Sequence, residues 1–135
     1  MSLLHFNHLH VFAAALLQWL LGALWYSPVL FAKPWKAMVG VPSEAKKSRM
    51  ILGMIASFVG SLMVSFMLMH VLWWSDTGSL RHALLVGLGI WIGFIFAPLC
   101  AQYIYEGRPF KLLAINTGYW LVALLASCAV LVRWH

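Results

Sequence analysis

Long apolar runs, separated by short polar segments, dominate the chain. Four such runs cover residues 9–31, 50–74, 80–105 and 110–132. Each run has about the 20 residues that an α-helix needs to cross a lipid bilayer. None of them alternates apolar and polar residues with the period of two that is typical of a membrane β-barrel. The pattern therefore predicts an all-α, polytopic membrane protein with four transmembrane helices in an antiparallel bundle.

The composition agrees with this prediction and fits one domain over residues 1–135. Of the 135 residues, 64% are hydrophobic and 9% are charged, whereas soluble domains are about half apolar. The segments SDTGS and EGRP join the second helix to the third and the third to the fourth. Both pairs are expected to form hairpins, with Ser79 among the candidate N-cap residues and Gly107 in the left-handed position that ends a helix.

Basic residues are unevenly divided between the two ends of the predicted bundle. The net charge is +6. Seven Lys and Arg residues lie on one side and two on the other: Lys33, Lys36, Lys46, Lys47, Arg49, Arg108 and Lys111 against Arg81 and Arg133. Because cytoplasmic loops are enriched in Lys and Arg, both termini are expected on the non-cytoplasmic side of the inner (plasma) membrane. No separate basic domain could bind nucleic acid, so the basic loop is interpreted as a contact for anionic lipids.

The segment ALWYSPVLFAKPW, residues 23–35, ends the first apolar run with aromatic, Pro and Lys residues. At about 1.5 Å per residue, Trp25 lies about 24 Å along the helix from Leu9, near the membrane boundary. Trp and Tyr side chains are preferred at this depth. Pro28 lacks the N–H that a helix needs, so a kink or a helix end is predicted there. Two interpretations stay open, an interfacial anchor and a functional hinge that lines a cavity.

The segments LGALWYSPVLFAKPW and EGRPFKLLAINTGYW resemble a bacterial membrane family known as domain of unknown function 1761, and the resemblance covers essentially the whole chain. The motif positions are Gly22, Trp25, Tyr26, Ser27, Pro28, Phe31, Trp35, Glu106, Gly107, Asn116 and Tyr119. The chain departs from the family pattern at Ala32, where glycine is common, and at Trp120, where histidine is frequent. The resemblance implies an architecture and no activity.

Polar side chains within and beside the apolar runs are the candidate binding residues. Gln18, Asn116 and Tyr119 lie deep in the predicted helices, where they must face protein or water. Glu106 and Arg108 flank the turn between the last two helices and are expected to form a local ion pair. The complete candidate set is Gln18, Trp25, Tyr26, Ser27, Glu106, Arg108, Asn116 and Tyr119.

Two predicted helices carry small residues at four-residue spacing. These positions are Gly53, Ser57, Ser61 and Ser65 in the second helix, and Gly89, Gly93, Ala97 and Ala101 in the third. Small residues at this spacing let helix backbones approach closely in lipid. The pattern favours packing, within the bundle or between copies of the chain, over a pore lining. It predicts a homo-oligomer.

Histidines concentrate at the non-cytoplasmic end of the predicted bundle. All six lie there: His5, His8, His10, His70, His82 and His135. Imidazole is a ligand for zinc, copper and haem iron. A metal site formed by His10, His70 and His82 is therefore a hypothesis, against the alternative of ordinary interfacial histidines. Apart from this metal hypothesis, the sequence does not identify a cofactor.

The sequence does not define an activity. It contains no recognised nucleophile–base pair, phosphate loop or nucleotide fingerprint, which argues against an enzyme. No Asp or Glu lies inside a predicted helix, whereas a proton-coupled exporter would use a buried carboxylate. The favoured hypothesis is a self-assembling membrane protein that binds or conducts a small solute or lipid. The alternatives are a membrane metal or haem protein and an accessory subunit of another membrane protein.

Overall fold

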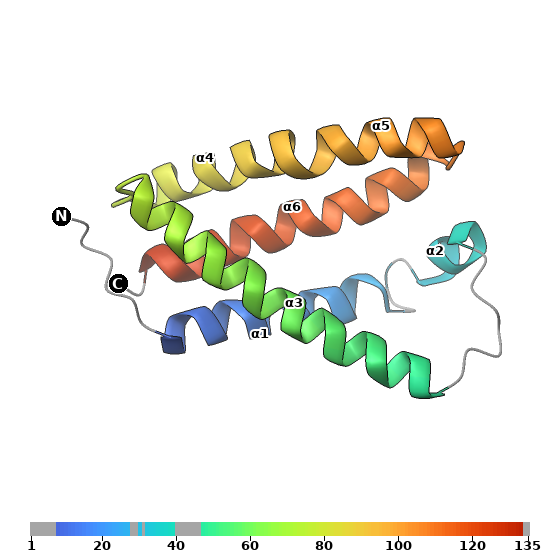
Figure 1. The fold of residues 1–135 in the computed structure, drawn as a ribbon, viewed down its shortest axis with the longest axis horizontal. Helices are drawn as coiled ribbons and strands as arrows, with labels where there is room; N and C mark the ends of the chain where they lie inside the picture. Colours follow the sequence, from blue (N-terminus) through green and yellow to red (C-terminus); the bar gives the residue numbers. More distant parts are fainter. Residues whose placement is uncertain (1–7, 28–29, 31, 40–46, 134–135) are drawn as a thin grey trace.

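The computed structural model describes residues 8–27, 30, 32–39 and 47–133, and every regular element within them is a helix (Figure 1). The elements are α1 (His8–Trp25), α2 (Ala32–Val39), α3 (Lys47–Trp74), α4 (Leu80–Ile90), the π-helix η1 (Trp91–Phe96), α5 (Ala97–Glu106) and α6 (Phe110–Arg133). The all-α prediction is confirmed.

Three helical segments are long and apolar enough to cross a membrane. They are Ser48–Trp74, Leu80–Glu106 and Phe110–Arg133, and they correspond to the last three predicted helices. The apolar part of α1, Leu9–Trp25, is shorter. The structure therefore has the helices of a multi-pass membrane protein, and the fourth span stays a prediction.

The first predicted helix, 9–31, is shorter in the structure. α1 ends at Trp25, and the Ser27 hydroxyl donates a hydrogen bond of 2.6 Å to the carbonyl of Leu24 at this end. The short α2 follows as a separate helix (Figure 1). The alternative of a helix end is thus correct, although Pro28 itself lies outside the described residues. The sequence analysis did not predict α2.

The third predicted helix, 80–105, is continuous but contains a π-helical segment. In η1 the backbone N–H of Ala97 donates to the carbonyl of Ile92, five residues earlier, which defines a π turn. The Trp91 indole nitrogen donates to the carbonyl of Thr117 in α6 at 2.7 Å. The Trp91 ring also stacks on Phe96, with centroids 5.2 Å apart. These contacts fix the segment against α6.

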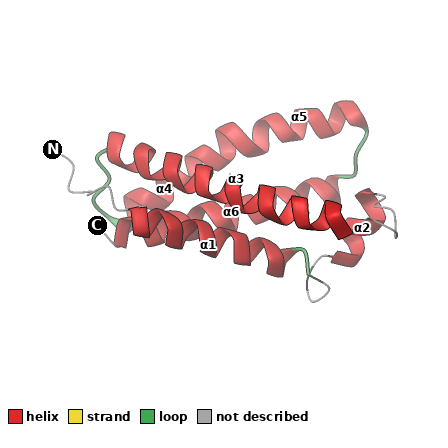
Figure 2. Ribbon diagram, turned by 60° about the horizontal axis from the view of Figure 1, so that its bottom comes forward, coloured by secondary structure: helices red, strands yellow, loops and turns green. Residues whose placement is uncertain are grey.

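The helices are arranged around α6 (Figures 1 and 2). α1 packs against α3 and α6, and α4 packs along another side of α6. The core lies where these four helices meet, and its side chains include Leu68, Met69, Leu72, Cys128 and Leu131, each at most 3% exposed. Many large apolar side chains outside this core are exposed, as expected where a helix faces lipid.

The turn between α3 and α4 reverses the chain, as predicted. Ser79 is the N-cap of α4, because its hydroxyl accepts a 3.1 Å hydrogen bond from the backbone N–H of His82. The two helices then diverge, since α3 crosses α1 while α4 follows α6 (Figure 1). The predicted hairpin is thus present at its turn, whereas along its length α3 packs on α1, where Ser65 accepts a hydrogen bond from Gln18.

An apolar groove of about 450 Å³ lies between the diverging helices. Its walls and floor include Met63 and Met67 of α3, Ile90 and Ile95 of α4 and η1, and Trp120 of α6.

The turn between α5 and α6 has the predicted geometry. Gly107 adopts φ 66° and ψ 25°, the left-handed conformation that favours glycine. The backbone N–H of Arg108 then donates to the carbonyl of Tyr103 at 3.0 Å.

The bundle has two ends, and basic residues are divided between them. We refer to them as the α3–α4 end and the α5–α6 end, after the turn that each contains. Among the described side chains, Lys33, Arg49, Arg108 and Lys111 lie at the α5–α6 end, and Arg81 and Arg133 lie at the α3–α4 end. The division predicted from the sequence is therefore consistent with the fold.

Candidate functional site

α1 and α6 approach each other closely because each helix places a glycine opposite an aromatic ring of the other. A Cβ atom on Gly118 would lie 3.2 Å from Trp25 Cζ2, and one on Gly22 would lie 3.2 Å from Tyr119 Oη. Both distances are shorter than ordinary carbon contacts, which are about 3.5–4.0 Å. We refer to Gly22, Trp25, Gly118 and Tyr119 as the α1–α6 clasp.

Each aromatic residue of the clasp also donates a hydrogen bond across the interface. Trp25 Nε1 donates to the carbonyl of Ile115 at 2.9 Å, and Tyr119 Oη donates to the carbonyl of Gln18 at 3.0 Å. Inside a helix, each backbone carbonyl already accepts a hydrogen bond from the N–H four residues later. The bonds from Trp25 and Tyr119 are therefore second bonds to the same two oxygens. The clasp thus joins α1 and α6 by two hydrogen bonds as well as by the contact of ring and glycine.

Three side chains from α1, α5 and α6 form a hydrogen-bonded chain beside the clasp. The Tyr26 hydroxyl, just after α1, donates to Asn116 Oδ1 at 2.8 Å. Asn116 Nδ2 donates to the Tyr103 hydroxyl oxygen at 2.7 Å. Tyr103 is 5% exposed. We refer to these three residues as the polar chain.

Aromatic and charged side chains surround the polar chain at the α5–α6 end. Trp35 of α2 packs edge-on against Tyr26, with centroids 5.4 Å apart. The Arg108 guanidinium lies 4.4 Å from the centroid of the Tyr103 ring, a cation–π contact. Arg108 also pairs with Glu106 at 3.5 Å, and both side chains are partly exposed. The predicted ion pair is therefore confirmed.

Gln18 belongs to a separate group in the middle of the bundle. Its Nε2 donates to the Ser127 hydroxyl of α6 at 2.8 Å and to the Ser65 hydroxyl of α3 at 3.2 Å. All three residues are 0% exposed. We refer to them as the Gln18 triad.

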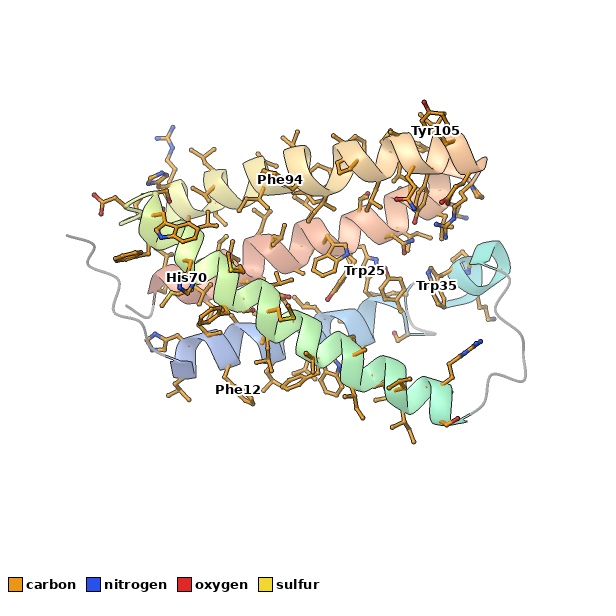
Figure 3. All side chains as sticks on the ribbon, viewed as in Figure 1. Phe12, Trp25, Trp35, His70, Phe94 and Tyr105 are labelled. Carbon is orange, nitrogen blue, oxygen red and sulfur yellow. The ribbon has the colours of Figure 1, made fainter. Side chains whose placement is uncertain are left out.

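The predicted binding residues thus lie in three places: around the clasp and the polar chain, at the end of α1, and, for Gln18, in the triad. Trp25, Tyr26, Asn116 and Tyr119 form one cluster with Arg108 at its edge. Glu106 pairs with Arg108 and accepts a 3.1 Å bond from Gln102, whereas the Ser27 hydroxyl donates to the carbonyl of Leu24 at the end of α1. Figure 3 shows Trp25 between α1 and α6 and Trp35 on α2.

Three residues of the polar chain and the Gln18 triad were not among the predicted binding residues: Tyr103, Ser65 and Ser127. Ser65 had been selected only as one of the small residues at four-residue spacing. Tyr103 lies 13 positions before Asn116, but it is four residues before Gly107 whereas Asn116 is nine after it. The turn therefore does not align the two residues, and Tyr103 had no local signal in the sequence. Ser127 had no local signal, because small polar residues are common in membrane helices and its role depends on contact with α1.

His10, His70 and His82 lie at the α3–α4 end. The described residues contain no group of three His, Cys, Asp or Glu side chains suited to one metal ion. His70 Nδ1 lies 2.9 Å from the carbonyl of Phe66, and its ring packs between Phe66 and Trp74, with centroids 4.5 and 5.6 Å away. His5 and His135 lie outside the described residues. The metal hypothesis therefore stays a prediction.

These features define an all-helical protein with the apolar segments of a multi-pass membrane protein. A family model described as "Protein of unknown function (DUF1761)" matches residues 9–132, so the chain belongs to this family. The resemblance carried by the two motif segments is thereby confirmed. No curated protein and no solved structure matches the chain.

Proposed function

We propose that this chain is a four-span inner-membrane protein that binds a small anionic solute or the phosphate of a lipid headgroup at its α5–α6 end. The polar chain carries this proposal, because it holds more hydrogen-bond donors than it uses. The binding residues are Tyr26, Tyr103, Asn116 and Arg108. The clasp, with Trp25 and Tyr119, holds α1 and α6 in the position that brings the polar chain together.

The donor surplus follows from the chemistry of the three side chains. The two tyrosine hydroxyls carry one hydrogen each and the Asn116 amide carries two. Two hydrogen bonds join the three residues. Reversing the Asn116 amide would reverse both bonds and still use only two hydrogens. A buried donor without a partner costs about 1–3 kcal/mol, so a ligand that accepts a hydrogen bond would stabilise this group.

The charges around the polar chain favour an anion. Arg108 has five N–H donors, and its contact with Glu106 is a single long one at 3.5 Å. Lys111 is exposed in the first turn of α6, where the helix dipole also favours negative charge. The first turn of α6 contains no acidic residue. A phosphate, from a lipid or free in solution, combines the required acceptors and charge.

Binding is tested with the purified full-length chain in mild detergent, using native mass spectrometry. Phosphatidylglycerol should be retained in preference to phosphatidylcholine, and Arg108→Gln should abolish the preference. Arg133→Gln, which removes a cation from the α3–α4 end, is the matched control and should preserve it. If inorganic phosphate alone raises the unfolding temperature in an Arg108-dependent way, the free anion is the ligand. Equal retention of both lipids, with no effect of phosphate, would contradict the proposal.

The proposed orientation places the α5–α6 end in the cytoplasm and both termini outside. It is supported by the division of basic residues between the two ends. Arg81→Cys and Lys111→Cys, both at exposed positions of opposite ends, provide a matched pair in a background without Cys100 and Cys128. An impermeant thiol reagent added to intact cells should label the first variant and not the second. The opposite labelling would reverse the orientation.

We also propose that the chain forms a homo-oligomer through the outer face of α4, η1 and α5. Gly89, Gly93, Ala97 and Ala101 are all exposed there. In a regular α-helix, positions four residues apart rotate by about 40° per step around the axis. The wider turns of η1 reduce the rotation per residue and keep the first three positions close to one line. A straight row of small residues supports close approach of a second helix in lipid.

A further inference from the structure

The Gln18 triad lies in a part of the bundle that is closed on every side. Neighbouring turns of the same three helices contribute apolar side chains that are at most 3% exposed: Ala14 and Ala15 from α1, Leu68 and Met69 from α3, and Leu124, Cys128 and Leu131 from α6. A polar group in such a place is costly unless its hydrogen-bonding capacity is used.

The Gln18 amide is only half used. Its Nε2 donates to Ser65 and Ser127, which accounts for both amide hydrogens. Its carbonyl oxygen Oε1 is buried and has no hydrogen-bond partner among the described residues. A buried acceptor left in this state costs about 1–3 kcal/mol.

The two serine hydroxyls are also only half used. Each accepts from Gln18, and neither hydroxyl hydrogen has an acceptor within residues 8–27, 30, 32–39 and 47–133. Three other serines differ in this respect. Ser27, Ser57 and Ser75 each donate to a carbonyl of their own helix, at 2.6, 2.9 and 2.9 Å, which is the usual arrangement in membrane helices.

Reversing the Gln18 amide does not satisfy the group. Oε1 would then accept from both serine hydroxyls, but both N–H groups of Nε2 would lose their acceptors. In either orientation the three side chains cannot pair all their donors and acceptors with one another. The triad therefore needs a further hydrogen-bonding partner.

We propose that the Gln18 triad binds one buried water molecule, which donates to Gln18 Oε1 and accepts from a serine hydroxyl. Water both donates and accepts, and buried waters typically make about three hydrogen bonds to such groups. A halide ion has no hydrogen to donate to Oε1. A metal cation would enter the bilayer centre without a carboxylate, because Asp76 and Glu106, the acidic residues in the described part of the chain, lie outside the helices of the triad. The proposal is independent of the anion site at the α5–α6 end.

The chain offers a direct test, because Gln18 and Gln102 are its only glutamines. The full-length protein, labelled with ¹³C in glutamine and alanine, is reconstituted in bilayers and studied by water-edited solid-state NMR. Gln102 is exposed at the α5–α6 end and is the hydrated reference, whereas Ala14 and Ala15, both 0% exposed, are the dry reference. The Gln18 side-chain carbonyl should gain signal from water almost as fast as that of Gln102. Transfer as slow as that to the Ala14 methyl group would overturn the proposal.

Two further measurements identify the ligand and its contacts. Replacing sodium by lithium or potassium should leave the Gln18 carbonyl shift unchanged, since a salt-dependent shift would indicate a bound cation instead of water. In a Ser65→Ala, Ser127→Ala variant, the transfer to Gln18 should fall to the level of the alanine methyl groups while Gln102 is unaffected. Transfer retained in a folded variant would refute the role of the serines. If this variant does not fold, the rate of transfer from water to Gln18 in the wild-type protein is the test of the proposal.

Discussion

The α1–α6 clasp and the outer face of α4–α5 both contain glycines, but only the glycines of the clasp are covered. Gly22 and Gly118 each lie under an aromatic ring, whereas a Cβ atom on Gly89 or Gly93 would have nothing within 4 Å. The rings of the clasp also have N–H and O–H groups that reach backbone carbonyls. Within these two regions, a glycine thus has a partner in the chain only where an aromatic side chain lies opposite.

The two regions also differ in the polarity of their side chains. Next to the clasp, side chains of α1, α5 and α6 form the polar chain. On the outer face, large apolar side chains flank the small ones and project away from the bundle, as Figure 3 shows for Phe94 and Tyr105, which are 78% and 92% exposed. This outer surface suits lipid or a second protein chain. The clasp is therefore expected to affect folding, and the outer face association.

The largest effect is expected from filling the space that Trp25 occupies. Gly118→Leu forces the indole away from α6 and weakens its bond to Ile115, so the free energy of unfolding should fall by about 1–3 kcal/mol. Reversible unfolding in detergent or bilayers, followed by tryptophan fluorescence, measures this change.

Gly53→Leu is the matched control, because Gly53 is an exposed helical glycine with open space around it. Its effect should stay within about 0.5 kcal/mol. If both variants unfold alike, the clasp is not the reason for the close approach of α1 and α6.

A smaller effect, on association alone, is expected from Gly93→Leu. A leucine at this position would keep two copies of the α4–α5 face apart, which should raise the dissociation constant of the oligomer by about tenfold, or about 1.4 kcal/mol. Single-molecule photobleaching in lipid vesicles at a series of protein-to-lipid ratios measures the constant. The unfolding free energy of the monomer should not fall. A wild-type chain that is monomeric at every ratio would rule out self-association.

Local signals in the sequence were sufficient for the three long helical segments and the two turns between them. Ser79 and Gly107 act through their own backbone neighbours, so the N-cap of α4 and the end of α5 could be predicted. The apolar runs likewise gave three helices of the right length. The end of α1 was open between two alternatives, because a proline limits a helix without fixing the residue at which it ends.

Contacts between distant segments decided what the sequence left open. The motif positions Gly22, Trp25, Asn116 and Tyr119 were visible as a set, but their pairing into the clasp and the polar chain required the packing of α1 on α6. At η1, Trp91 bonds to the carbonyl of Thr117 in α6, a contact that no local pattern encodes. The divergence of α3 and α4 follows from the competing contacts of each helix with α1 or α6.

The smallest effect is expected from removing one hydrogen bond of the clasp while keeping an aromatic ring. Trp25→Phe loses the 2.9 Å bond to the carbonyl of Ile115, but this oxygen keeps its bond within the helix. Interhelical hydrogen bonds in membranes contribute about 0.6 kcal/mol on average, so a loss of that order is expected beyond the change in ring size. Trp120→Phe corrects for ring size, since the Trp120 indole makes no hydrogen bond within the described chain and its ring is partly buried. The difference in unfolding free energy between the two variants measures the bond together with the contact of the indole six-membered ring on Gly118, which phenylalanine also loses. No difference would mean that neither the donor nor this contact stabilises the clasp.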